Sequence, residues 1–63
     1  MKLIDQLHGT EYSVGDIIRD DYGTDWFILG FSSYHWVQVI ENDKLAEVAQ
    51  KFHVGTFALK VEV

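Results

Sequence analysis

The side chains of this chain that could carry out chemistry are mainly carboxylates. Asp20 and Asp21 are adjacent, and Asp25 follows them closely in a stretch that also contains Gly23 and Thr24. Two neighbouring carboxylates can serve as general acid and base when burial raises the pKa of one of them. A short run of Asp, Gly and Thr is instead typical of a solvated turn. The simplest interpretation is a soluble hairpin tip, and an acidic binding face is the functional alternative. We predict that the chain is not an enzyme.

Other patterns for catalysis or metal binding are not found in the sequence. The chain has no cysteine, which excludes disulfides, thiolate metal sites and a cysteine nucleophile. His8, His35 and His53 are isolated from one another, whereas a zinc site usually takes ligands paired at short spacing. We therefore expect no metal and no cofactor.

The charge of the chain narrows the class of partner. Ten acidic residues stand against five basic ones, a net charge of −5. The excess is concentrated in residues 11–25, where Arg19 is the one basic residue. A nucleic-acid binder needs a basic stripe to displace counterions from phosphates, so we do not expect direct nucleic-acid binding. No apolar run is long enough to span a membrane, and we expect a cytoplasmic domain without membrane contact.

The elements that must position these residues follow from the hydrophobic pattern. The chain of 63 residues is short enough for one domain, residues 1–63. The segment at residues 3–7 fits either a helical turn or a short strand with Leu3 and Leu7 inward. Strands are predicted for residues 14–19, 25–31, 34–40 and 57–63, and a helix for about residues 43–52. The expected fold class is a small α+β protein, mainly antiparallel β, with a strongly curved sheet of four to five strands or an SH3-like barrel. The short helix precedes its C-terminal strand.

The barrel alternative comes from a resemblance. Val14-Gly15-Asp16-Ile17-Ile18, an acidic turn with Gly23 and a strand from Trp26 to Phe31 resemble the first hairpin of SH3-like small barrels. The resemblance covers residues 14–40. It implies a closed small barrel with a short 3₁₀ turn before the last strand, so the helix predicted here would be a departure from that family.

Aromatic side chains give a second candidate feature for binding. The chain has two tryptophans, three tyrosines and four phenylalanines, which is more than a core of this size easily hides. Regular alternation predicts a core of Phe27, Leu29, Phe31, Val37, Val39, Phe57, Leu59 and Val61. Trp26, Tyr34 and Trp36 would then lie at least partly on the surface, unless the predicted helix covers them.

These features predict a non-enzymatic protein-binding module that presents an acidic and aromatic face to a basic protein partner. The candidate binding residues are Asp20, Asp21, Tyr22, Asp25, Trp26, Tyr34 and Trp36. The size and charge suggest an accessory or inhibitor protein of a phage or mobile element. One alternative is a binder of single-stranded nucleic acid or a small ligand that uses the aromatics as a stacking platform. Another is a subunit of a homo-oligomer joined through strand edges.

Overall fold

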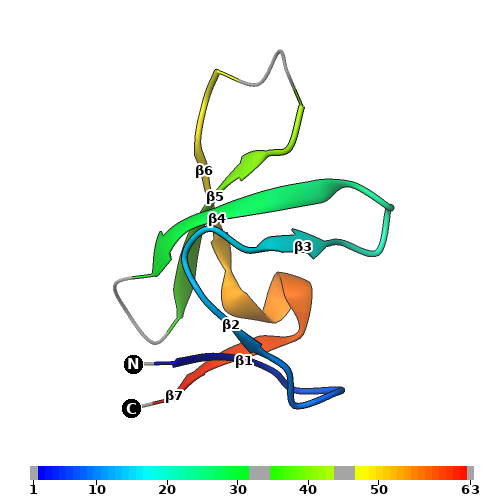
Figure 1. The fold of residues 1–63 in the computed structure, drawn as a ribbon, viewed down its shortest axis with the longest axis vertical. Helices are drawn as coiled ribbons and strands as arrows, with labels where there is room; N and C mark the ends of the chain where they lie inside the picture. Colours follow the sequence, from blue (N-terminus) through cyan, green and yellow to red (C-terminus); the bar gives the residue numbers. More distant parts are fainter. Residues whose placement is uncertain (1, 32–34, 44–46, 63) are drawn as a thin grey trace.

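The structure, a computed structural model, describes residues 2–31, 35–43 and 47–62. Its strands form two antiparallel sheets (Figure 1), one with the order β2-β1-β7 and one with the order β3-β4-β5-β6. The elements are β1 (Lys2–Asp5), β2 (Glu11–Tyr12), β3 (Ile17–Arg19), β4 (Asp25–Phe31), β5 (Trp36–Glu41), β6 (Gln50–His53), the 3₁₀ turn η1 (Val54–Phe57) and β7 (Leu59–Glu62). The described part of the chain is thus mainly antiparallel β.

The three-stranded sheet joins the two ends of the described chain. β1 pairs with β7, with Leu3 opposite Val61, and the two termini lie side by side in Figure 1. Of the two alternatives for the first segment, the strand is therefore correct. Leu3 is fully buried, as that alternative requires, but Leu7 lies beyond the strand in a turn and is exposed.

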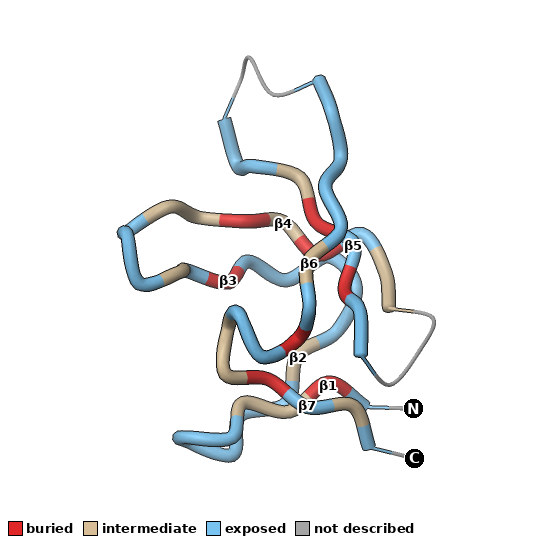
Figure 2. Tube along the Cα trace, turned by 180° about the vertical axis from the view of Figure 1, so that it is seen from behind, coloured by how far each residue is buried: buried red, intermediate tan, exposed pale blue. Residues whose placement is uncertain are grey.

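One core holds the two sheets together. The buried residues are Leu3, Ile18, Trp26, Ile28, Val37, Val39, Val54 and Leu59, shown in red in Figure 2. Leu3 and Leu59 come from the three-stranded sheet, and most of the others from the four-stranded sheet. The predictions of strands at residues 25–31 and 34–40 are confirmed by the β4–β5 hairpin, within its described residues.

A β-bulge interrupts that hairpin. The pairing passes from Ile28 opposite Val39 to Gly30 opposite Gln38, so Leu29 is an extra residue in β4. An extra residue reverses the alternation of a strand beyond it, because successive side chains point to opposite faces. The single face predicted for Phe27, Leu29 and Phe31 therefore does not exist.

The bulge changes which side chains of β4 fill the core. Trp26 and Ile28 are buried before the bulge, and Phe31 packs against the same core after it. Phe27 is half-buried, and Leu29 is exposed. The prediction that Phe27 and Leu29 are core residues is wrong, as is the prediction that Trp26 lies partly outside. Val37, Val39 and Leu59 are core residues, as predicted.

The helix predicted for residues 43–52 is wrong. Its last residues belong to β6, where Phe52 pairs with Val37, and Val48 before that strand has no regular structure and is 73% exposed. Residues 44–46 lie outside the described part of the chain. An isolated helix of this length is marginally stable in water, whereas pairing with β5 satisfies backbone groups and places Phe52 against the core.

The segment before the last strand is a 3₁₀ turn, η1. The His53 imidazole accepts a hydrogen bond from the amide of Gly55 at its start, and Ala58 leaves it with φ of 54°. Within the described residues the two sheets do not close into a barrel. No helix in that part of the chain is long and apolar enough to cross a membrane.

Candidate acidic and aromatic site

The turn between β3 and β4 is organised by the Asp20 carboxylate. It accepts hydrogen bonds from the amides of Tyr22 and Thr24, both at 2.9 Å, and from the Trp26 indole Nε1 at 3.0 Å. Gly23, with φ of 83°, supplies the positive φ that lets the chain reverse. Aspartate is favoured in such turns because its short side chain can reach the backbone amides that follow it. The sequence from Asp20 to Trp26 therefore fixes one carboxylate in place.

Hydrogen bonds keep two carboxylates of this turn ionised. The bond from the Trp26 indole is the main cause that lowers the pKa of Asp20, against the smaller effect of partial burial. The Asp25 carboxylate accepts hydrogen bonds from the Arg19 guanidinium, at 2.7 Å from Nε and 3.3 Å from Nη2. These bonds lower the pKa of Asp25 and raise the pKa of Arg19.

The charges of the turn differ in how far they are neutralised. Asp25 is paired with Arg19 across the β3–β4 pair. Within the described residues Asp20 is bonded only to neutral donors, which leave its negative charge uncancelled. Asp21 is exposed, and no hydrogen bond or ion pair within the described residues engages its carboxylate. The uncompensated negative charge therefore lies at Asp20 and Asp21.

A small hollow opens beside this turn, with a volume of about 260 Å³. Its walls come from the turn, from β4, from β6 and from η1, and the residues lining it are Asp20, Asp21, Tyr22, Trp26, Phe52, Thr56 and Phe57. Three of the rings pack edge to face: Trp26 lies 5.2 Å from Phe52 and 6.5 Å from Phe57, and these two lie 5.7 Å apart. The hollow thus has an aromatic wall and an acidic rim. We call it the acidic hollow.

The acidic hollow includes four of the seven predicted binding residues. Asp20, Asp21 and Tyr22 line it, and Tyr22 is 94% exposed. Trp26 also lines it although the residue is only 7% exposed, because the indole lies in the core with its N–H bonded to Asp20. Asp25 begins β4 directly after this turn and does not line the hollow, and its carboxylate is paired with Arg19.

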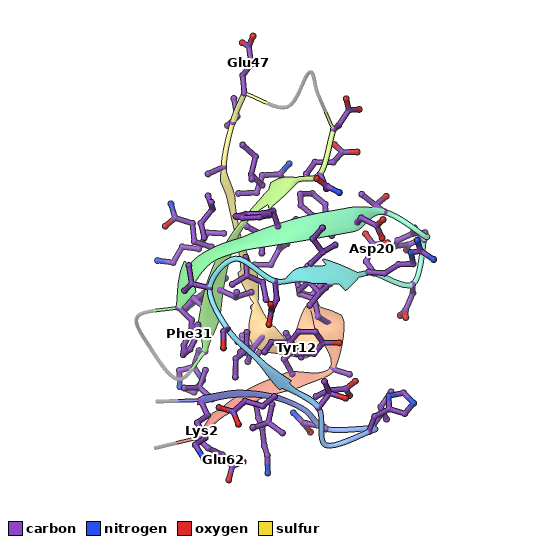
Figure 3. The ribbon with its side chains drawn as sticks, in the orientation of Figure 1. Lys2, Tyr12, Asp20, Phe31, Glu47 and Glu62 are labelled. Atoms are coloured by element: carbon purple, nitrogen blue, oxygen red, sulfur yellow. The ribbon has the colours of Figure 1, made fainter. Side chains whose placement is uncertain are left out.

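The other two predicted binding residues are Tyr34 and Trp36. Tyr34 lies outside the described residues. Trp36, which is 42% exposed, lies beyond the far end of β4, and Figure 3 shows Asp20 and Phe31 at opposite ends of that strand. Trp36 belongs to a second depression, described below. The single acidic and aromatic face predicted from the sequence is therefore two separate surfaces.

Sequence reasoning missed part of the acidic hollow. The sequence pattern places Phe52 on a predicted helix and Phe57 in the predicted core, and it gives no signal for Thr56. No pattern in the sequence connects them with the turn at Asp20, because the hollow forms where β6 and η1 pack beside Trp26. The one available signal would have been to assign Phe52 to a strand, which would have placed its ring beside the β4–β5 hairpin.

The second depression lies at the other end of the β4–β5 hairpin and has a volume of about 360 Å³. It is lined by Gly30, Phe31, Trp36, Gln38 and Lys51. The Lys51 ammonium lies over the Trp36 ring, 5.6 Å from its centroid, a geometry in which a cation is attracted to the ring face. We call this surface the Trp36 groove. It combines an aromatic wall with a positive charge.

The described residues contain no group of three or more His, Asp or Glu side chains arranged to hold a metal ion. The chemistry available at the acidic hollow is therefore that of a fixed carboxylate, a free carboxylate and aromatic rings. Neither a scan against protein-family models nor searches of curated proteins and of solved structures found a match for this chain.

Proposed function

We propose that this chain is a non-enzymatic protein-binding module whose acidic hollow receives a basic side chain of a protein partner. The observation that carries the proposal is the combination of free negative charge and aromatic surface in one hollow, with Asp21 and Tyr22 exposed at its rim. An arginine or lysine has the matching form, because its apolar stem packs on rings while its charged head reaches a carboxylate.

The state of the carboxylates favours binding over proton transfer. The pKa of Asp20 is lowered by its hydrogen bonds, whereas a general acid at neutral pH needs a raised pKa. A carboxylate that stays ionised is suited to attract a cation. The net charge of −5 adds a long-range attraction for basic surfaces.

The rigidity of the turn should help recognition. Asp20 fixes the backbone that follows Asp21 by accepting bonds from the amides of Tyr22 and Thr24. A surface that is already ordered loses less conformational entropy when a partner docks. In this proposal Asp21 and Tyr22 contact the partner, and Asp20 is a positioning residue.

The volume of the hollow sets the scale of recognition. About 260 Å³ accommodates one or two side chains rather than a helix. A single anchoring side chain surrounded by weaker contacts is the usual arrangement of an interface hot spot, which contributes about 2 kcal/mol or more. We therefore expect the basic residue of the partner to dominate the affinity.

A titration with a short blocked arginine-rich peptide tests this proposal. Asp21→Lys and Tyr22→Ala should each weaken binding about tenfold or more by calorimetry, while the melting temperature stays near that of the parent. Glu11→Lys is the matched control, because it makes the same charge change at an exposed position of the other sheet. Equal affinity for Asp21→Lys and Glu11→Lys would mean that the change in net charge alone explains the loss of binding. That result would contradict a specific site.

We also propose that the fold is related to the SH3-like small barrels. The 3₁₀ turn η1 directly before β7 supports the relation, since that family places such a turn there. The division of the described strands into two sheets is the feature that differs from a closed barrel.

A further inference from the structure

The Trp36 groove is shaped by the absence of a side chain at its centre. Gly30, Gln38 and Lys51 form one row across β4, β5 and β6. A Cβ atom added at Gly30 would meet nothing within 4 Å, so the space above it is open. Trp36 borders this open space, and Lys51 approaches from the opposite strand. The groove can therefore admit a flat side chain against the indole.

The charge of the groove is available for pairing. Two other basic residues are already paired, Arg19 with Asp25 and Lys60 with Glu62 at 3.7 Å. Lys51 has no carboxylate partner within the described residues, and its ammonium lies over the Trp36 ring. An incoming carboxylate could pair with it without displacing an existing ion pair. The groove thus fits an acidic group next to an aromatic ring.

The β3–β4 turn of the same chain presents that combination. Tyr22 is 94% exposed, and the neighbouring Asp21 carboxylate has no partner among the residues that the structure describes. The turn is held in a fixed conformation by Asp20, which reduces the entropy lost on docking. The turn and the groove lie at opposite ends of β4 (Figure 3), so the groove can receive only the turn of another molecule.

We propose that the Trp36 groove binds the β3–β4 turn of a second copy of this chain, with Tyr22 against Trp36 and Asp21 paired with Lys51. The contact is head-to-tail, since each copy offers a turn at one end and a groove at the other. A head-to-tail contact that does not close into a ring produces an open chain of molecules. The contact area is small, so association is weak, with a dissociation constant of about 0.1–1 mM.

This self-association is independent of the proposed function but shares its turn. A basic partner in the acidic hollow would contact Asp21 and Tyr22, and would therefore compete with a second copy. The two contacts also differ in their response to salt. Two copies with a charge of −5 each repel at low ionic strength, and moderate salt screens that repulsion more than a close ion pair. Self-association should thus strengthen from low to moderate salt, whereas binding of a basic peptide should weaken.

Sedimentation over a range of protein concentrations tests the proposal. The parent should form species larger than a dimer as concentration rises. Asp21→Lys and Lys51→Glu should each lower the association constant about tenfold or more, and the double variant should recover it. Mixing the two single variants should also restore association, because each supplies the charge that the other lacks. Lys60→Glu and Glu11→Lys are the matched controls and should associate like the parent.

Other outcomes would overturn the proposal. They are a parent that stays monomeric at every concentration, a Lys51→Glu variant that associates like the parent, and a double variant that does not recover. Circular dichroism checks that each variant is folded. Lys51→Glu should still bind the arginine-rich peptide, so that a failure of self-association and a failure of the proposed function are measured separately.

Discussion

The two tryptophans of this chain lie near opposite ends of the β4–β5 hairpin and have different environments. Trp26 is 7% exposed, packs against two phenylalanine rings and bonds its indole N–H to Asp20. Trp36 is 42% exposed and contacts the Lys51 ammonium and the His53 ring. Trp26 therefore anchors the acidic hollow from inside the core, while Trp36 offers its ring to the outside.

The difference comes from the hydrogen-bond acceptor that the Trp26 indole N–H finds. A tryptophan can be buried when its N–H finds an acceptor, and the Asp20 carboxylate supplies one at the turn. The same bond lowers the pKa of Asp20 and fixes the turn that carries Asp21. At this end of the hairpin, one hydrogen bond, from Trp26 to Asp20, supports both the burial of the indole and the position of the turn carboxylates. At the Trp36 end the aromatic surface can be changed without loss of the core.

The largest predicted effect separates the two tryptophans. Trp26→Ala should lower the free energy of unfolding by about 3–5 kcal/mol, because it leaves a cavity in the core. Trp36→Ala should cost less than about 1 kcal/mol, since its ring is partly solvated. Urea denaturation followed by circular dichroism measures both. Similar losses for the two variants would contradict the assignment of Trp26 to the core.

A second pair of variants tests the bulge. Ile28→Ala should cost about 2–5 kcal/mol because Ile28 is fully buried, and Leu29→Ala should cost about 1 kcal/mol or less at its exposed position. The control is Val39→Ala, which should destabilise the fold because Val39 lies opposite Ile28 in the core. A larger loss of unfolding free energy for Leu29→Ala than for Ile28→Ala would contradict the bulge and support the regular alternation predicted from the sequence.

The predicted alternation of inward and outward side chains in β4 is wrong near a glycine, and that glycine is the one indication of a bulge in the sequence. An isolated glycine inside a strand often marks a bulge, and Gly30 follows the bulged Leu29 directly. The hairpin itself was predictable, because β-branched and aromatic residues fill both strands. The faces of β4 were not, since one extra residue reverses them and the burial of Trp26 depends on a bond to Asp20.

The helix shows a second limit of sequence reasoning. Leu45, Val48, Ala49 and Phe52 have helical spacing, yet Phe52 lies in β6. The same spacing does not reveal that a neighbouring strand offers hydrogen bonds and that Trp26 offers a ring. For the site, the local part was predictable, because Asp20, Asp21, Tyr22 and Trp26 lie within one short stretch. The contributions of Phe52, Thr56 and Phe57 depend on tertiary packing.

A pH titration sharpens the contrast at the acidic turn. The pKa of Asp20 and of Asp25 is lower in the folded chain than its ordinary value of 3.8. Their contribution to stability is thus complete above that value and is lost as pH falls through the lower folded-state pKa. Asp20→Asn should be less stable at neutral pH and lose less stability on acidification. The free energy of unfolding, measured for parent and variant from pH 7 to about pH 2, tests this. The same pH dependence for both proteins would contradict it.

The smallest predicted effect lies at Val48. Because Val48 is 73% exposed and outside any strand, Val48→Asp should change the free energy of unfolding by about 0.5 kcal/mol or less. On the predicted helix the same change would bury an unpaired carboxylate and unfold the domain. The melting temperature of this variant decides between the two arrangements, with Val39→Asp as the severely destabilised comparison.

The two indole N–H groups report directly on the central claim that the acidic hollow binds a basic side chain. In an amide-correlation NMR spectrum of the ¹⁵N-labelled chain, Trp26 and Trp36 should give separate indole signals, because the two rings have different environments. At a protein concentration well below the dissociation constant of self-association, addition of the arginine-rich peptide should shift the Trp26 indole signal and the backbone signals of Asp21 and Tyr22, and leave the Trp36 indole unchanged. A shift confined to Trp36, or saturating binding with no change at Trp26 or at Asp21 and Tyr22, would contradict the account.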